Sequence, residues 1–242
     1  MNTCLEICCG NWQSVCAAVA GGANRIELCA ALPVGGVTPT AGLLRQVRAA
    51  FPQLCVHVLI RGREGNFVYS EDEVAAMIDD VTRCVELGAQ GIVCGALTTE
   101  GELDLRTMAR LAKAAGTLSL TCHRAFDFSK DFPVSLESLI DIGFSRVLTS
   151  GGASSALMGT ATLRSLREQA AGRIIVMPGA GINPGNVREL IEKTGCMEVH
   201  ASCTKRVRQT TEGPSLGRAD EGDCWVTDAG LVEQIQSQLL LL

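Results

Sequence analysis

The sequence has few aromatic residues and few histidines. Phe, Trp and Tyr supply 4% of its 242 residues, and only 3 histidines occur. A hydrophobic core must therefore be built mainly from Ala, Val, Ile, Leu and Cys, and apolar residues as a whole make up 47% of the chain. This apolar fraction, with 19% charged residues, is typical of a globular protein and excludes an intrinsically disordered one.

A basic excess, a long apolar run and a signal peptide are also missing. The 21 Lys and Arg against 26 Asp and Glu give a net charge of −5, so no nucleic-acid partner, which would need a basic face, is expected. No apolar run approaches the ~18 residues of a membrane-spanning helix, and we expect no membrane partner. The N-terminal residues lack the basic and apolar segments of a signal peptide, which favours a cytoplasmic location.

Cysteine is abundant, with 12 residues, but no two cysteines have the Cys-x-x-Cys spacing. This absence excludes zinc ribbons and thioredoxin-like redox motifs. Without secretion, a disulfide framework is not expected either. Most of the cysteines stand inside apolar runs, where free Cys acts as a small hydrophobic residue.

Short apolar runs alternate with longer segments of helical periodicity along the whole chain. The predicted strands are 4–8, 25–29, 54–61, 91–95, 117–123, 146–150, 173–177 and 196–201. The predicted helices are 11–21, 40–51, 70–87, 103–114, 133–142, 156–170, 183–193 and 227–240. Alternating strands and helices pair their strands in parallel, and eight such units in about 250 residues are typical of a (β/α)₈ barrel.

We therefore predict a single (β/α)₈ TIM-barrel domain over residues 1–242. The alternative, a doubly wound sheet, would place a glycine fingerprint after the first strand, and the residues around Gly10 do not form one. The segment 202–226, between the eighth strand and the eighth helix, is long and without periodicity. We expect it to be an irregular, lid-like loop.

Active sites of TIM barrels lie at the carboxyl ends of the strands, and polar residues gather at the predicted ends here. All three histidines lie in or at the end of a predicted strand. Such a cluster is either a structural network that neutralises its own charges or a set of acid–base groups with shifted pKa values, and both readings stay open. The candidate catalytic residues are Glu6, Glu27, His57, Arg61, His123, Arg124 and Asp127.

Two cysteines share a strand face with two of these carboxylates. Side chains two residues apart point the same way, so Glu6 goes with Cys8 and Glu27 with Cys29. Charged side chains avoid the helix layer, and we expect both pairs to point into the barrel. Two thiolates on neighbouring strands suit Cu(I) better than tetrahedral zinc, which makes Cys8 and Cys29 the candidate metal ligands.

Glycines cluster where the sixth and seventh predicted strands end. Ser150 and Gly151 follow the sixth strand, and Gly179 and Gly181 follow the seventh. Backbone N–H groups in such loops, beside a helix N-terminus, are able to hold an anion. The alternative is that these glycines only allow tight turns.

Several segments match a known family. The sequence resembles the CutC copper homeostasis proteins in Glu6-Ile7-Cys8-Cys9, Arg25-Ile26-Glu27-Leu28-Cys29, Gly35-Gly36-Val37-Thr38-Pro39, Ile60-Arg61, Phe67-Val68-Tyr69-Ser70, His123-Arg124-Ala125-Phe126-Asp127, Arg146-Val147-Leu148-Thr149-Ser150-Gly151, Pro178-Gly179-Ala180-Gly181-Ile182 and Glu198-Val199-His200. The resemblance implies a (β/α)₈ barrel, a cytoplasmic location, a role in copper handling and Cu(I) binding through Cys8 and Cys29. One loop departs from the family pattern Arg-Pro-Arg-Gly-Gly-Asp-Phe and reads Arg61-Gly62-Arg63-Glu64-Gly65-Asn66-Phe67.

Three functions remain as hypotheses. The first is a cytosolic copper homeostasis protein that binds Cu(I) through strand-end cysteines. The second is a TIM-barrel enzyme with lyase- or isomerase-like acid–base chemistry on a small anionic or phosphorylated metabolite. The third is an interaction protein in which the polar cluster is purely structural. The sequence does not determine the oligomeric state, and a homo-oligomer is one of the open alternatives.

Overall fold

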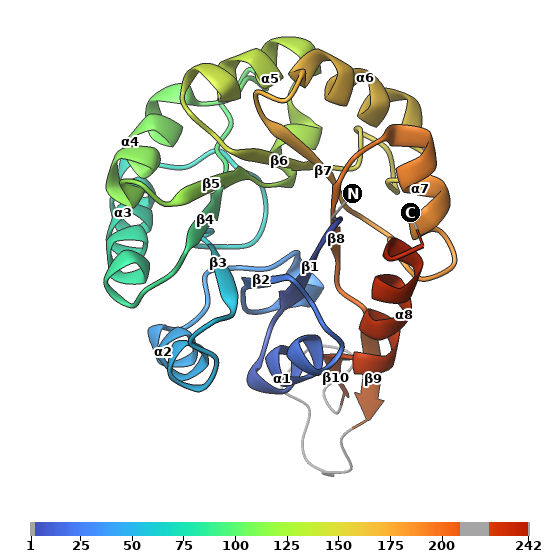
Figure 1. Ribbon diagram of the computed structural model, residues 1–242. Helices are drawn as coiled ribbons and strands as arrows, with labels where there is room; N and C mark the ends of the chain where they lie inside the picture. The colour runs from blue at the N-terminus through green and yellow to red at the C-terminus, as the bar shows by residue number, and fades with distance from the viewer. Residues whose placement is uncertain (1–2, 209–222, 242) are drawn as a thin grey trace.

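The computed structural model describes residues 3–208 and 223–241, which form a barrel of parallel strands with helices outside it (Figure 1). The strands are β1 Cys4–Cys9, β2 Arg25–Leu28, β3 Cys55–Leu59, β4 Gly91–Cys94, β5 Ser119–Cys122, β6 Arg146–Thr149, β7 Ile175–Pro178 and β8 Glu198–Ala201. The helices are α1 Trp12–Ala20, α2 Ala41–Ala50, α3 Glu71–Glu86, α4 Leu105–Ala115, α5 Phe132–Asp141, α6 Thr160–Ala170, α7 Val187–Thr194 and α8 Ala229–Leu239.

The strands hydrogen-bond in the order β7-β6-β5-β4-β3-β2-β1-β8, each parallel to its neighbour. Strands β7 and β8 lie side by side and bring the ring close to closure, as Figure 1 shows. The (β/α)₈ TIM barrel predicted from the periodicity is therefore confirmed. In the described residues, no helix is both long enough and apolar enough to cross a membrane.

Alternate residues of strand β1 face two different environments, the core against the helices and the interior of the barrel. Leu5, Ile7 and Cys9 are fully buried in the hydrophobic core between strands and helices. Glu6 and Cys8 alternate with them and point into the barrel, which confirms the predicted parity. Apolar residues thus hold the strand against the helices and leave the inner face free for polar side chains.

The predicted helices overlap the observed ones, with shifts at their ends. The capping box expected at Ser70 and Glu73 is present at the start of α3. Helix α6 begins at Thr160 rather than at residue 156, because the preceding residues form a turn in which the Ala156 N–H donates to the Ala180 carbonyl at 3.0 Å.

Two short 3₁₀ helices, η1 Leu32–Val34 and η2 Arg124–Phe128, were not predicted from the sequence. They follow β2 and β5 at the carboxyl ends of the strands. Elements of three to five residues are too short to show helical periodicity, which explains why the pattern misses them.

The segment 202–226 is not irregular at its ends, and the expectation of a wholly irregular loop needs this correction. Strands β9 Thr204–Arg208 and β10 Asp223–Thr227 pair in antiparallel fashion there, and the rest of the predicted loop, 209–222, lies outside the described residues. The run Thr-Lys-Arg-Val-Arg has one apolar residue in five, too few for a visible strand pattern. The hairpin is tied to the barrel by Asn11, whose Nδ2 donates to the Trp225 carbonyl at 3.2 Å.

Candidate functional site

A cavity of about 440 Å³ opens at the carboxyl ends of the strands. Six of the candidate residues chosen from the sequence line it: Cys8, Glu27, Arg61, His123, Arg124 and Gly181. The remaining candidates do not line it: Glu6, His57, Asp127, Ser150, Gly151, Gly179 and Cys29. The cavity is also lined by His200, which the sequence placed at a strand end without assigning it a role.

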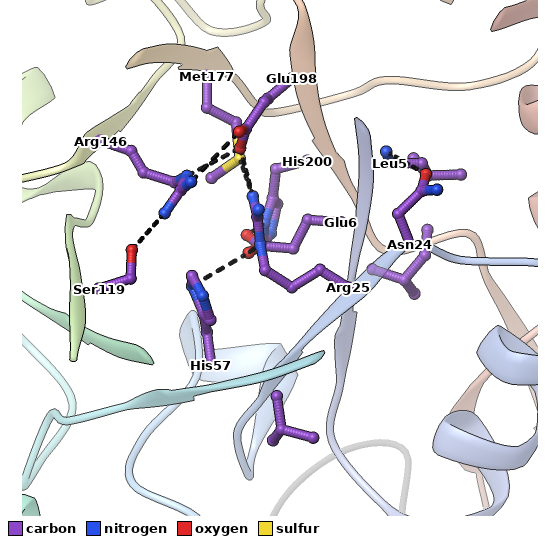
Figure 2. Close-up of polar contacts among 12 residues, drawn as sticks. Leu5, Glu6, Asn24, Arg25, His57, Ser119, Arg146, Met177, Glu198 and His200 are labelled. Atoms are coloured by element: carbon purple, nitrogen blue, oxygen red, sulfur yellow. Dashed lines mark hydrogen bonds and ion pairs between the residues drawn. The ribbon is translucent and has the colours of Figure 1, made fainter. Parts of the chain in front are cut away.

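Glu6 on β1 is an ionised carboxylate buried between two partners (Figure 2). Its Oε2 accepts a hydrogen bond from Arg25 Nε at 2.5 Å, and its Oε1 lies 2.8 Å from His200 Nδ1. The register makes this possible, because Glu6 stands opposite Arg25 on β2 and opposite His200 on β8. Burial acts to raise the pKa of Glu6, but the His200 hydrogen bond and the Arg25 charge hold it well below its ordinary range.

The ion pairs continue across the barrel interior through residues that the sequence analysis did not select. Arg25 Nη2 donates to Glu198 Oε2 at 2.6 Å, and Arg146 Nε donates to the same oxygen at 2.8 Å (Figure 2). Arg146 Nη1 also donates to Ser119 Oγ at 2.7 Å. Strand parity could have identified two of these residues. Arg25 stands two residues before Glu27, and Glu198 stands two residues before His200, so each pair shares the inward face of its strand.

His57 lies beside this network and remains neutral. Its Nδ1 is 3.8 Å from Glu6 Oε2 and has no hydrogen-bond partner among the described residues. Burial lowers the pKa of His57 to about 4, with Glu6 opposing the shift. Gly91 on β4 makes room for the ring, since a Cβ there would lie 2.4 Å from His57 Cδ2. His57 is thus an interior packing residue below the cavity.

Glu27 and His200 form the polar floor of the cavity. Burial raises the pKa of Glu27 to about 7, with Glu6 adding to the shift and His200 and Arg25 opposing it. The buried Oε2 of Glu27 has no hydrogen-bond partner in the described part of the chain. Burial acts to lower the pKa of His200, but hydrogen bonds with the side chains of Cys8 and Glu6 raise it well above its ordinary value. A carboxyl group that titrates near neutrality beside an imidazole is suited to proton transfer.

Three of these groups lie close enough to be tested as a metal site. Glu6, Glu27 and His200 each offer a ligand atom, all within 4.8 Å of one another. Carboxylate and imidazole are hard to borderline donors and do not select Cu(I) as thiolates do. Both Glu6 oxygens already have partners in Arg25 and His200, which a cation would have to displace. The cluster therefore fits a proton-transfer network better than a metal.

The two candidate copper ligands differ in their surroundings. Cys8 lines the cavity, but its partner across β1 and β2 is Glu27, and Cys29 stands two residues further along. Cys29 is fully buried, packs with Leu59 and Val93, and donates its thiol to the Cys9 carbonyl at 3.6 Å. Burial raises the pKa of Cys29 well above its ordinary value, and the charge of the neighbouring Cys8 adds to the shift. The thiols are neighbours, but only one of them is open to the cavity.

The loop after β6, where an anion site was expected, is filled by a side chain of the protein. Asp127 in η2 accepts hydrogen bonds from the N–H groups of Ser150 and Gly152, each at 3.1 Å, and from Arg124 Nε at 2.8 Å. The Gly151 N–H donates to Thr149 Oγ1 at 2.9 Å. The carboxylate of Asp127 thus occupies the donors that an external anion would need.

The loop after β7 is different, because part of it is open to the cavity. Gly179 is a packing glycine, since its N–H donates to the Thr149 carbonyl at 3.0 Å and a Cβ would lie 2.5 Å from Leu148 Cδ1. Ala180 and Gly181 line the cavity with φ of +84° and +72°. Within residues 3–208 and 223–241 their N–H groups have no hydrogen-bond acceptor. A non-glycine residue at positive φ is uncommon, and nothing in the sequence predicts this backbone conformation at Ala180.

Arg61 and His123 line the opposite wall. Arg61 donates from Nη1 to the carbonyls of Val34 and Gly36, at 2.9 and 2.8 Å. His123 Nδ1 accepts the Ala125 N–H at 3.1 Å, so the neutral ring carries its proton on Nε2. Burial and the Arg61 charge lower the pKa of His123 to about 4, which keeps the ring neutral.

Solved structures share this architecture. CutC from Streptococcus agalactiae, whose name assigns it to copper homeostasis, superposes with a TM-score of 0.79 at 31% identity, covering 82% of this chain and 97% of that one. Phosphoribosyl anthranilate isomerase from Thermotoga maritima superposes with a TM-score of 0.59 at 13% identity, covering 99% of this chain and 100% of that one. At 13% identity, the second likeness shows the barrel fold alone.

Sequence relatives cover nearly the whole chain. A CutC protein from Xylella fastidiosa is 48% identical over 234 residues, which is 96% of this chain and 86% of the relative. A CutC protein from Chromobacterium violaceum is 46% identical over 245 residues and covers 99% of both chains. The model of the CutC family matches residues 3–205. The chain therefore belongs to the CutC family.

Proposed function

We propose that this CutC protein is an enzyme that carries out acid–base chemistry on a small anionic metabolite in the cavity at the strand ends. The reaction class is lyase- or isomerase-like, in which a proton moves to or from carbon or oxygen. The observation that carries the proposal is Glu27, a buried carboxyl group that lines the cavity and has its pKa raised to about 7. One of its oxygens has no hydrogen-bond partner in the part of the chain that the structure describes.

Glu27 is suited to act as the proton acceptor and donor. With a pKa of about 7, both its forms are populated at neutral pH, which is the condition for efficient general acid–base catalysis. A purely structural carboxylate in this position would be expected to have its oxygens paired. Beside it, His200 is oriented by its hydrogen bond to Glu6 and supplies positive charge where negative charge would develop on the reacting group.

Conversion of metabolites by the purified protein tests this proposal. Wild type, Glu27→Gln and a control variant, Glu168→Gln, would each be incubated with fractionated anionic metabolites, and depletion followed by mass spectrometry. Glu168 is an exposed residue paired with Arg164, far from the cavity lining. We expect a fraction depleted by wild type and by Glu168→Gln, and at least a hundredfold slower by Glu27→Gln. Equal depletion by Glu27→Gln would contradict the role of Glu27.

A second candidate function is cytosolic Cu(I) handling through Cys8 and Cys29. Two observations favour it: Cys8 lines the cavity, and Cys29 stands two residues beyond Glu27, the residue opposite Cys8 in the pairing of β1 with β2. The buried Cys8, Cys9 and Cys29 are free thiols, which is in keeping with a reducing compartment such as the cytoplasm. In this function copper is cargo rather than a catalyst.

An anaerobic Cu(I) titration against a competing chelator tests the copper candidate. Cys8→Ser and Cys29→Ser should each weaken binding, because a two-thiolate site loses half its ligands. Cys122→Ser is the matched control, since Cys122 is equally buried in β5 and its thiol donates to the His123 carbonyl at 3.6 Å. Unchanged affinity in both Cys8→Ser and Cys29→Ser would exclude this site.

A further inference from the structure

Among the described residues, Arg61 differs from the other buried arginines because it has no carboxylate partner. Arg25 pairs with Glu6 and Glu198, and Arg146 pairs with Glu198. Arg61 is only 6% exposed, yet no carboxylate of the described residues lies within ion-pair distance of it. A buried charge is stabilised when it is paired, so an unpaired guanidinium at the wall of a cavity is a notable exception.

The neighbours of Arg61 hold the guanidinium in place without neutralising it. Its three hydrogen bonds go to backbone carbonyls: Val34 and Gly36 accept from Nη1, and Gly65 accepts from Nη2 at 2.8 Å. The Phe67 ring lies 5.2 Å from the guanidinium carbon. The Nε–H has no hydrogen-bond partner within the described residues. Backbone carbonyls thus hold Arg61 in place, while one of its donors lacks a partner among the described residues.

The other cavity-lining groups leave this charge uncompensated. Arg124 is already paired, with Asp127 as its partner at 2.8 Å. Glu27 lies deeper in the barrel than Arg61, because it stands opposite residue 57 on β3, four residues before Arg61. Opposite, Ala180 and Gly181 line the cavity, and their N–H groups have no hydrogen-bond acceptor among the described residues. The upper part of the cavity therefore carries a positive charge and free hydrogen-bond donors.

We propose that Arg61 receives the anionic group of the cavity's ligand, a carboxylate or a phosphate, and is its main charge partner. This deepens the proposed function by assigning the substrate's negative charge to one residue. The planar guanidinium matches the oxygens of either group and favours an oxyanion over a neutral ligand. The glycine loop after β6 plays no part in it, because Asp127 occupies the donors there.

The position of Arg61 also orients the ligand. Residue 57 on β3 stands opposite Glu27 on β2, and Arg61 lies four residues further along, beyond the end of β3. The anionic group would thus sit near the mouth of the cavity. The reacting end of the ligand would lie deeper, over Glu27 and His200.

Binding of inorganic phosphate and of acetate to the full-length protein tests the assignment, with isothermal titration calorimetry and phosphorus NMR as readouts. Arg61→Gln should weaken phosphate binding about tenfold or more, because a charge-assisted hydrogen-bond partner is lost. Arg63→Gln is the matched control, since Arg63 is paired with the exposed Glu73 and does not line the cavity. The stronger of the two probes in wild type shows whether phosphate or carboxylate is the better fit.

A second variant covers the case in which Arg61→Gln fails to fold. Arg61→Lys keeps the positive charge but loses the planar fork, and should bind phosphate more weakly than wild type and Arg63→Gln. Phosphate affinity within twofold of wild type in Arg61→Lys and, where folded, in Arg61→Gln would overturn the assignment. So would failure of both probes to bind the wild type.

The test of the anion site at Arg61 and the test of the acid–base role of Glu27 can fail independently of each other. Glu27→Gln should leave phosphate affinity within about threefold of wild type, because Glu27 lies deeper in the barrel than Arg61, level with residue 57 on β3. Loss of metabolite conversion in Glu27→Gln with undisturbed phosphate binding in Arg61→Gln would refute the anion site alone. Phosphate binding that depends on Arg61, with conversion indifferent to Glu27, would refute the acid–base role alone.

Discussion

Glu6 Oε1 lies 2.8 Å from His200 Nδ1, joining the first and the last strand of the barrel through side chains that stand opposite each other in the ladder. The contact links β1 to β8 and orients the imidazole of His200 at the cavity floor. Arg25 holds the other oxygen of Glu6 at 2.5 Å. One carboxylate therefore both reinforces the pairing of β1 with β8 and sets the geometry of the site.

Glu6→Gln is expected to destabilise the protein by about 3 kcal/mol or more, because it leaves the buried Arg25 and His200 without their shared partner. Urea unfolding at pH 7 measures this. The pKa of Glu6 lies below its ordinary 4.5 in the folded state, so its stabilising effect is present above pH 4.5 and is lost as the pH falls. Glu168→Gln, at an exposed ion pair, should change stability by less than about 1 kcal/mol. Equal effects of the two variants would contradict the network.

Glu27→Gln is expected to stabilise the protein at alkaline pH. The folded state raises the pKa of Glu27 from 4.5 to about 7, so it holds the proton more tightly than the unfolded chain, and wild-type stability falls as the pH rises between these values. The neutral amide avoids this loss. The variant should gain up to about 3 kcal/mol over wild type at pH 8 and little below pH 4.5. Denaturant unfolding at several pH values checks the slope, and a difference independent of pH would refute it.

Gly91→Ala is expected to destabilise the barrel by about 1–3 kcal/mol, because the new Cβ would lie 2.4 Å from His57 Cδ2 in a packed interior. Gly62→Ala is the control, since nothing lies within 4 Å of a Cβ at that position. Combining Gly91→Ala with His57→Ala should remove most of the clash. Additive losses in this double variant, measured by urea unfolding, would show that the ring is not what Gly91 accommodates.

Asp127→Asn is expected to loosen the loop after β6. The amide loses the charge that accepts the N–H groups of Ser150 and Gly152, and we expect a destabilisation of roughly 1–3 kcal/mol. Arg124 would also lose its ion-pair partner, so phosphate affinity should rise in this variant. Calorimetric titration measures the affinity, and a lower affinity than in wild type would show that Asp127 does not compete with anions.

The fold could be predicted from the sequence because apolar residues recur with the period of a strand or a helix over enough residues to identify each element. The same parity placed Cys8 and Glu27 on the inner face, where the structure has them. Parity does not show what covers a side chain, and Cys29 is closed off by Leu59 and Val93. Nor does it show partners far apart in the chain, such as Asp127 and Ser150, which the unpredicted helix η2 brings together.

His200 was underestimated for a related reason. A single histidine in a strand carries no sign of its partners, and Glu6 is 194 residues away along the chain. Arg25 and Glu198 escaped notice because they stand at the start of their strands, while barrel sites lie at the ends. Their role is to neutralise charge beneath the site, a task that becomes visible only when the strands are in register.

The ion pairs from Arg25 through Glu198 to Arg146 also restrict the route by which a ligand reaches the cavity. Their side chains are at most 13% exposed and lie between the strands of the barrel, as Figure 2 shows. Ligand, product and any proton released by Glu27 must then share the mouth at the carboxyl ends of the strands. A ligand therefore has access to the barrel from one end only. A ligand bound at that mouth would also control when Glu27 exchanges protons with the solvent.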